Sequence, residues 1–136
     1  MSRLLIDTNI VIDLLAERIE FYSEAAILFS RGDKNKVELT TSALTFANTN
    51  YILSKQLGAA KAKKVLQKFK VLVAVLALND KITQLALGDD AFKDFEDGLQ
   101  YYTALENDVD VIITRNKGDF RSSRIPVLSA KEFLAR

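Results

Sequence analysis

Two aspartates follow apolar runs that have the length and composition of buried strands. Asp7 comes directly after Leu4–Ile6, and Asp119 lies a few residues beyond Val111–Thr114. In a parallel α/β sheet, ligands bind in the crevice at the carboxyl ends of the strands. The sequence therefore predicts that Asp7 anchors an acidic, metal-binding site, with Asp119 as a partner from a distant part of the chain.

Two further groups of polar residues are candidates for the same site. Asp94 and Asp97 are three residues apart at the start of a predicted helix, so they share one helix face, with Glu96 between them. Like charges this close repel, and a bound cation relieves the repulsion. Position alone favours Asp94 as the N-cap of its helix and Glu96 as a solvated first-turn acid. Asn48 stands among apolar neighbours in the middle of another predicted helix, which fits a core amide as well as a site residue.

The chain contains no histidine and no cysteine. Their absence excludes a Ser-His triad, a thiolate nucleophile, disulfides and zinc held by His or Cys. Catalysis would have to use carboxylates, hydroxyls, Lys or Arg, and carboxylates favour hard cations such as Mg²⁺ or Mn²⁺. The formal net charge of +1 gives no global argument for nucleic-acid binding, so a basic surface would have to be local.

A chain of 136 residues has the length of one domain, and we expect residues 1–136 to form one. No apolar run approaches the length needed to span a bilayer, and the first residues lack the basic, apolar and small-residue order of a signal peptide. We therefore expect a cytoplasmic protein.

Strands and helices alternate in the predicted secondary structure that carries these residues. Strands are expected at residues 4–7, 37–40, 71–76, 111–114 and, at a sheet edge because of its proline, 126–128. Helices are expected after an Asn9 cap, at 21–30, from Ser42 to Gly58, at 59–69, 80–88 and 94–106, and after the capping box Ser129–Glu132. The helix after Ser42 carries Leu44, Ala47, Tyr51 and Ile52 on one side. This alternation predicts a three-layer α/β/α domain with a central parallel sheet.

Three local motifs resemble those of the PIN-domain ribonucleases and, within that family, the VapC-like toxins. Leu5-Ile6-Asp7-Thr8-Asn9 resembles the family's first motif. The segment Asp97-Gly98-Leu99-Gln100-Tyr101-Tyr102-Thr103-Ala104 is similar to its third acidic motif, and Thr114-Arg115-Asn116 with Asp119-Phe120 is similar to its last. The three occur in the expected order, and with the tail around Pro126 and Glu132 the resemblance covers essentially the whole chain.

The resemblance implies a PIN-like fold in a flavodoxin-like arrangement, and an endoribonuclease that hydrolyses RNA phosphodiester bonds with Mg²⁺ or Mn²⁺. The implied catalytic residues and metal ligands are Asp7, Asp97 and Asp119, with Asn48, Asp94 and Glu96 as further metal-ligand candidates. The implied supporting residues are Thr114 and Asn116, which would position phosphate, water or a carboxylate, and Thr8 and Asn9, which would fix the turn around Asp7. The family also implies the toxin role of a type II toxin–antitoxin system, an antitoxin protein as partner, and a homodimer.

Position 48 departs from the family pattern, because family members usually carry a glutamate at this place in the helix. An amide oxygen can ligate a hard cation or its water, but it brings no charge and cannot act as a base. The alternative is therefore a weakened or inactive PIN domain that binds RNA or a protein partner. Glu96 and Asp94 are candidates to supply the missing charge.

Basic residues form two local groups. The group around Asp119, which is predicted to contact the RNA backbone, consists of Arg115, Lys117, Arg121 and Arg124. The second group, in which no acid intervenes, consists of Lys55, Lys61, Lys63, Lys64, Lys68 and Lys70, and a solvated helix face is the favoured interpretation. The aromatic residues Phe92, Phe95, Tyr101 and Phe120 have the spacing of core residues rather than of base-stacking platforms.

An aspartyl-phosphate enzyme or a phospho-receiver also places an aspartate after its first strand. Phosphatases of the haloacid-dehalogenase type need a second aspartate two residues later, where this chain has Asn9. A receiver needs additional acids near its first strand and a positioned late-strand lysine, and neither can be assigned here. This third class is the least favoured.

Overall fold

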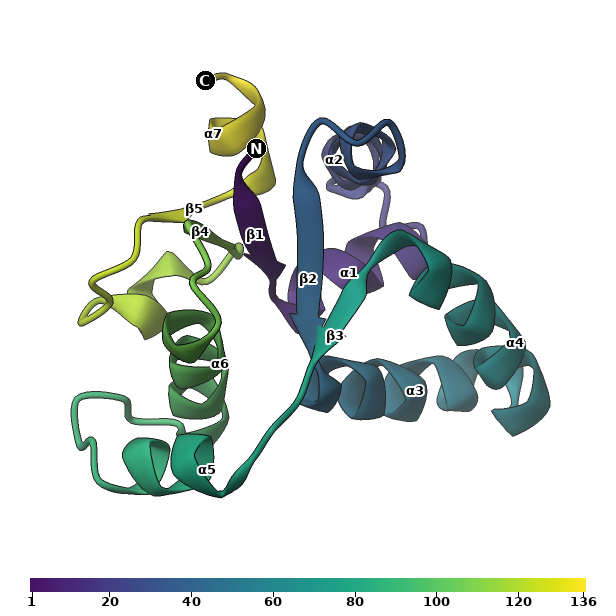
Figure 1. Cartoon of the computed structure of the whole chain (residues 1–136). Helices are drawn as coiled ribbons and strands as arrows, with labels where there is room; N and C mark the ends of the chain where they lie inside the picture. The colour runs from purple at the N-terminus through teal and green to yellow at the C-terminus, as the bar shows by residue number, and fades with distance from the viewer.

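The strand that precedes Asp7 lies in the middle of the sheet. In the computed structural model, which describes residues 1–136, β1 (Arg3–Ile6) is the third strand of a sheet with the order β3-β2-β1-β4-β5, and all neighbouring strands are parallel (Figure 1). The other strands are β2 (Glu38–Ser42), β3 (Ala74–Leu76), β4 (Val111–Ile113) and β5 (Val127–Leu128). The expected edge position of the strand after Pro126 is confirmed.

Seven helices connect and cover these strands. They are α1 (Thr8–Leu15), α2 (Tyr22–Asp33), α3 (Ala43–Leu57), α4 (Ala59–Phe69), α5 (Asp80–Leu87), α6 (Phe95–Glu106) and α7 (Ala130–Leu134), with 3₁₀ turns η1 (Lys70–Leu72) and η2 (Lys117–Phe120). Ser42, Asn79 and Asp94 cap α3, α5 and α6, and Ser129 with Glu132 forms the predicted capping box of α7. No helix is both long enough and apolar enough to cross a membrane.

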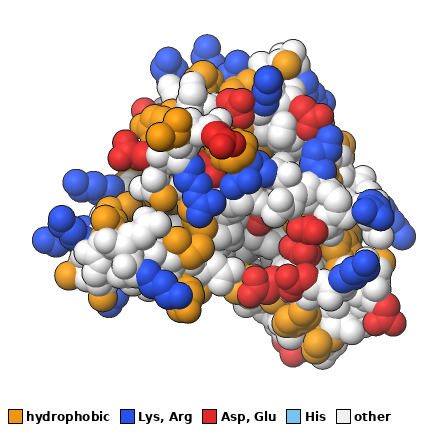
Figure 2. Space-filling model, turned by 180° about the vertical axis from the view of Figure 1, so that it is seen from behind, with side chains coloured by type: hydrophobic (Ala, Val, Ile, Leu, Met, Phe, Trp, Pro, Cys, Tyr) orange, Lys and Arg blue, Asp and Glu red, His pale blue; other side chains and the backbone are white.

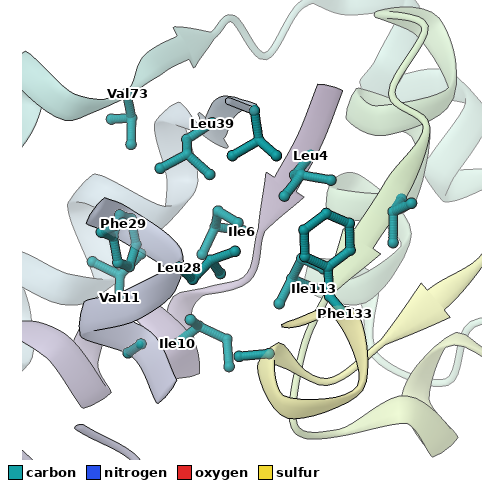
Figure 3. Packing of buried hydrophobic residues seen from close by; sticks show 14 of the residues in the cluster. Leu4, Ile6, Ile10, Val11, Leu28, Phe29, Leu39, Val73, Ile113 and Phe133 are labelled. Atoms are coloured by element: carbon teal, nitrogen blue, oxygen red, sulfur yellow. The ribbon is translucent and has the colours of Figure 1, made fainter. Parts of the chain in front are cut away.

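The alternating side chains of β1 divide the interior into two cores. Leu4 and Ile6 pack with residues of α1, α2 and α7 on one face of the sheet, and Figure 3 shows them close to Phe29 of α2 and Phe133 of α7. Leu5 points to the other face, where it joins a cluster built largely by α6 and the segments around it. A strand buried on both faces must be apolar throughout, which explains the run before Asp7. The predicted three-layer α/β/α fold is confirmed.

Several boundaries differ from the sequence prediction: α2 and β2 end three and two residues later than expected, and two further differences have a clear physical reason. Asp7, not Asn9, caps α1, because the Asp7 Oδ1 atom accepts a hydrogen bond from the Thr8 backbone N–H at 2.8 Å. The strand expected at residues 71–76 begins only at Ala74, because residues 70–72 form η1 as a continuation of α4. Val71 is 85% exposed in that turn, so its β-branched side chain gains nothing from the sheet, and strand propensity alone does not decide the conformation.

Helices α3 and α4 form an antiparallel pair that extends away from the sheet, which we call the α3–α4 arm (residues 43–69) (Figure 1). Gly58 joins the two helices with a φ of +87°, a conformation that side chains with a Cβ rarely adopt. On α3 the buried residues are Thr45, Thr49 and Leu53. The apolar stripe that includes Tyr51 is therefore only partly a core face: Leu44 packs against a cluster of α5 and α6 residues, whereas Tyr51 is 61% exposed, since α4 packs on a different side of α3.

Candidate functional site

The carboxyl ends of β1 and β4 meet at the point where the strand order reverses. The chain runs outward from β1 through β2 to β3 and then returns to place β4 on the other side of β1. Such a switch point opens a crevice above the sheet. Asp7 follows β1 and Thr114 follows β4, so the topology brings together two residues that are distant in the sequence.

Asp7 is nearly buried and receives hydrogen bonds on both carboxylate oxygens. Its Oδ1 accepts from the Thr8 backbone at 2.8 Å and from Gln100 Nε2 at 3.2 Å. Its Oδ2 accepts from Thr114 Oγ1 at 2.8 Å and from Asn9 Nδ2 at 3.3 Å. Burial raises the pKa of Asp7, and the bonds from Thr114, Thr8 and Gln100 act in the opposite direction. The network fixes the carboxylate in one orientation.

The other predicted acids surround the same opening. A cleft of about 510 Å³ is lined by the carboxylates of Asp7, Asp94, Glu96, Asp97 and Asp119. Figure 2 shows acidic side chains gathered beside a hollow near the middle of one face. Asp94 also caps α6, since its Oδ1 accepts from the Glu96 backbone N–H at 3.0 Å. Of the three acids proposed as catalytic, Asp7 follows β1, Asp97 lies in α6 and Asp119 lies in η2, and all three line this cleft.

The carboxylates are close enough to influence one another's ionisation. The pKa of Asp97 is raised to about 7, first by burial and then by the charges of Asp119, Asp94, Asp7 and Glu96. No three of the acids converge closely enough to form a ready-made cage for one ion. The cleft therefore concentrates negative charge without neutralising it, and a cation entering it would be stabilised by several carboxylates at once.

Asn48 lines this cleft rather than the core. It is half-buried on α3, and its Nδ2 atom donates to Glu96 Oε2 at 3.4 Å. The side chain at the position where a glutamate was expected thus faces the carboxylate of Glu96. The structure gives the site a negative charge beside the neutral amide.

Gln100 is a member of the site that sequence reasoning missed. It is 3% exposed, and its Nε2 atom donates to Asp7 and, at 3.0 Å, to Thr45 Oγ1. Its Oε1 atom is buried without a hydrogen-bond partner, which leaves an acceptor unused at the edge of the cleft. Gln100 could have been predicted from its position three residues after Asp97, because this spacing places both side chains on one face of α6.

Two of the basic residues predicted to contact RNA have partners inside the protein. The Arg115 guanidinium makes two bonds to Asp13, at 2.8 and 3.1 Å, and lies 4.0 Å from the centre of the Phe21 ring. The Asp13 side chain is only 1% exposed. Lys117 pairs with Glu132 at 3.0 Å. Arg115 thus joins the loop after β4 to α1.

The remaining predicted residues are more accessible. Arg121 lines a second cavity beside Asp97 and Asp119, and Arg124 is exposed. Asn116 is exposed at the cleft, and its backbone N–H donates to Thr114 Oγ1 at 3.0 Å. Thr8 donates to Thr45 Oγ1 at 3.1 Å, which ties the start of α1 to α3.

Three of the four aromatic residues assigned to the core are buried, with ring centres between 5.0 and 6.4 Å apart; they are Phe92, Tyr101 and Phe120. The assignment of Phe95 was wrong, because Phe95 is 42% exposed. It is the first residue of α6, directly after the cap, and its side chain does not lie on the packed side of the helix.

Comparisons with known proteins identify the family and agree with the fold. A family model described as PIN domain matches residues 3–118. The chain is 33% identical to "Ribonuclease VapC1" of Aquifex aeolicus over 144 residues, which covers 99% of this chain and 95% of that protein.

Solved structures share the fold at lower identity. The structure of VapBC-1 from nontypeable Haemophilus influenzae superposes with a TM-score of 0.72 at 18% identity, covering 96% of this chain and 99% of the other. The Mycobacterium tuberculosis toxin VapC20, described as cleaving the sarcin–ricin loop, superposes with a TM-score of 0.63 at 14% identity, covering 80% and 86%.

Proposed function

The chain belongs to the PIN-domain family, and from this premise we propose that it is a metal-dependent endoribonuclease that hydrolyses phosphodiester bonds in RNA. The observation that carries the proposal is the meeting of Asp7, Asp97 and Asp119 in one cleft with Glu96 and Asp94. The cleft is strongly negative and contains no His or Cys, so it would repel a phosphate by itself. Hydrolysis of a phosphodiester there requires a hard cation that offsets the charge.

The oxygen-rich lining fits Mg²⁺ or Mn²⁺. Mg²⁺ keeps several waters and is held by one or two carboxylates together with substrate phosphates, so a cage of three protein acids is not required. Asp7, Asp97 and Asp119 would hold the ion, and the free Oε1 of Gln100 is placed to accept from a water in the cleft. When bound, such an ion lowers the pKa of a water and neutralises charge on the phosphodiester.

The protein's own residues would set the geometry for this reaction. Thr114 and Asn9 hold the Asp7 carboxylate from the β4 side, and Gln100 holds it from α6. Asn116 and Arg121, at the rim, are accessible to an RNA phosphate, while Arg115 and Lys117 remain engaged with Asp13 and Glu132. We therefore retain Arg121 and Arg124 as RNA contacts and assign Arg115 and Lys117 to positioning the loop.

The test compares two aspartate-to-asparagine variants on a labelled RNA with Mn²⁺. Asp119→Asn removes a charge from the cleft, and we expect cleavage to fall by at least about 100-fold. Asp108→Asn is the matched control, because Asp108 is an exposed acid in the turn before β4, at the opposite end of that strand. Equal cleavage by the parent and Asp119→Asn would contradict the proposal.

Asn48 favours a second candidate, a PIN domain that binds RNA or a protein partner and cleaves weakly or not at all. The Glu96 carboxylate beside the amide supports the active alternative. Asn48→Glu distinguishes them: a large gain in cleavage would mark the natural site as weakened, whereas little change would mean that Glu96 already supplies the charge. Calorimetry with Mn²⁺ gives an independent measure, since an inactive site should bind no ion at millimolar concentration.

We further propose that the chain is the toxin of a type II toxin–antitoxin pair, with an antitoxin protein as partner and a homodimer as its assembly. The similarity to VapC1 and to a structure titled VapBC-1 supports this role. Growth arrest on induction of the parent, and none on induction of Asp119→Asn, is the expected result. Sedimentation of the purified chain tests the dimer.

A further inference from the structure

We propose that one flank of the cleft, formed by α3 and the turn after α1, seats single-stranded RNA, with Tyr51 stacking on a base and Arg18 holding a neighbouring phosphate. The proposal rests on the proposed function in taking RNA as the ligand. It adds which residues beside the acids recognise the strand: Tyr51 and Arg18.

Charge is distributed unevenly around the cleft. The charged residues from α6 and η2 are all acidic, whereas Arg18 is the only basic residue in the lining. Arg18 is exposed and takes part in no ion pair. It follows α1, and α1 packs against α3, so Arg18 and Tyr51 belong to the same side of the opening. Within the cleft, a phosphate therefore meets one cation of the protein, and that cation lies on this flank, whereas Arg121 lines the neighbouring cavity beside Asp97 and Asp119.

Tyr51 has the features of a stacking platform. It is 61% exposed although it lines the cleft, and its ring packs on no other aromatic residue. The Lys55 ammonium lies 4.2 Å from the ring centre, one helical turn further along α3. Asn48 precedes Tyr51 by three residues on the same side, so this face of α3 leads from the acids to the ring and then to the lysine. A rigid aromatic ring beside a cation suits a base and its phosphate.

The basic charge continues beyond Lys55 along the α3–α4 arm. Between Leu39 and Asn79 the chain has six lysines and no acid, and none of these lysines forms an ion pair. Figure 2 shows basic side chains spread over the side of the molecule to which the arm projects, away from the acidic hollow. Such a surface attracts a polyanion without regard to base sequence. This extends the earlier interpretation of the group as a solvated helix face.

Stacking selects a single strand. In a duplex the bases are already stacked on one another and their faces are inaccessible, whereas an unpaired base can swing onto an aromatic side chain. A partner that contacted only phosphates would use the lysines and have no use for Tyr51. The juxtaposition of Tyr51, Arg18 and the acids therefore points to an unpaired segment.

The test measures fluorescence anisotropy of a labelled unstructured RNA oligonucleotide and of the same RNA annealed to its complement. The protein carries Asp119→Asn to prevent cleavage, and Ca²⁺ is present to offset the acidic charge. In this background we expect Tyr51→Ala to weaken single-strand binding by about 5- to 100-fold and to leave duplex binding unchanged. Tyr51→Phe keeps the ring and should bind as the background does. Tyr22→Ala, which removes an exposed tyrosine of α2, is the matched control and should also bind normally.

Arg18 is tested by salt dependence. Arg18→Ala should reduce the slope of log affinity against log salt by about 0.7, the loss of one phosphate contact on a single strand, and Arg31→Ala on α2 should not change it. Because Tyr51 and Arg18 are exposed, thermal unfolding of all variants should match the background. Single-strand affinity of Tyr51→Ala within twofold of the background, or an equal loss on duplex RNA, would overturn the proposal and leave Tyr51 as a surface for a protein partner.

The result of this binding test is independent of the result of the cleavage test for the proposed function. If the parent does not cut RNA but Tyr51→Ala loses single-strand binding, the catalytic proposal fails and the binding site stands. If the parent cuts RNA and Tyr51→Ala binds as the background does, the catalytic proposal stands and the binding site fails.

Discussion

At the scale of single residues, the site depends on how Asp7 is held. Its four donors come from three different parts of the chain: the start of α1, α6 and the end of β4. A buried carboxylate with satisfied hydrogen bonds keeps its orientation without reorganisation when a ligand arrives. The residues around Asp7 should therefore matter nearly as much as Asp7 itself.

Gln100→Leu tests this dependence. The substitution keeps the volume of the side chain approximately but removes the donor to both Asp7 and Thr45. Loss of a residue that orients a metal ligand typically costs about 10- to 100-fold in metal affinity or activity. We expect a loss of that size in both cleavage and Mn²⁺ binding measured by calorimetry. Gln84→Leu, on the exposed side of α5, provides the control. Unchanged Mn²⁺ affinity would show that Gln100 has no orienting role.

The raised pKa of Asp97 predicts that the stability of the metal-free protein depends on pH. The folded protein raises the pKa of Asp97 from 3.8 to about 7, so between these values it holds a proton that the unfolded chain releases. The contribution to stability is fully present below the unfolded value and is lost as the pH rises towards about 7. We expect melting temperatures in EDTA to fall over this range, and less steeply in Asp97→Asn.

Saturating Mn²⁺ should raise the melting temperature most at the high-pH end, because the ion competes with the proton. A parent and an Asp97→Asn variant with parallel profiles would contradict the assignment.

The acids of the site could be predicted from sequence because they sit at recognisable strand ends and helix starts. Asp7, Asp97 and Asp119 were found in this way. Gln100 and Tyr51 were not, because a glutamine in a helix and a tyrosine in an apolar stripe have many structural roles. Only the packing of α3 against α4, which leaves the Tyr51 side open, distinguishes an accessible ring from a core one.

At the scale of elements, the loop after β4 is held to α1 by a buried ion pair. Arg115 joins Asp13 through two hydrogen bonds and covers the Phe21 ring. The sequence suggested an RNA contact for Arg115, since nothing in the motif reveals that Asp13, more than 100 residues earlier, lies within reach. The same pair fixes the segment that carries Asn116 and leads into η2 with Asp119.

Arg115→Ala should destabilise the fold strongly. It leaves the Asp13 carboxylate, whose side chain is only 1% exposed, as an uncompensated buried charge, and such changes cost about 3 kcal/mol or more. Lys117→Ala breaks the pair with Glu132, whose side chains are both nearly half exposed, and should cost less than about 1 kcal/mol. Urea unfolding of the two variants gives the comparison. Equal losses would mean that burial of Asp13 does not govern the strength of its pair.

Helix limits were predictable where capping residues mark them, as at Ser42, Asn79, Asp94 and Ser129. The limits were not predictable where tertiary packing decides. Val71 and Leu72 have the composition of a strand but continue the turn after α4, whose last residue, Phe69, packs against Phe29 at 5.3 Å between ring centres. The alternation of elements was sufficient to predict a parallel three-layer fold, but not the strand order, which depends on long-range pairing.

At the scale of the whole molecule, two surfaces of opposite charge lie on either side of one opening. The acids lie over α6 and η2, and the lysines follow the α3–α4 arm. The net charge of +1 conceals this separation, because the two groups nearly cancel. Local distribution, not total charge, is therefore the relevant quantity for binding a polyanion to this protein.

The central place of β1 in the sheet has a consequence for the time at which activity appears during synthesis. β1 is made first, yet one of its two edges is paired by β4, and Asp7 receives its shortest side-chain hydrogen bond from Thr114, beyond β4. A nascent chain from which residues 111–113 have not yet emerged lacks the second edge, and one from which residue 119 has not yet emerged lacks one acid of the cleft. The enzyme that we propose would consequently remain harmless on the ribosome until most of its length has emerged. In a synchronised cell-free translation, RNA cleavage should begin only after residue 119 has left the exit tunnel, and earlier cleavage by stalled chains would contradict this order of assembly.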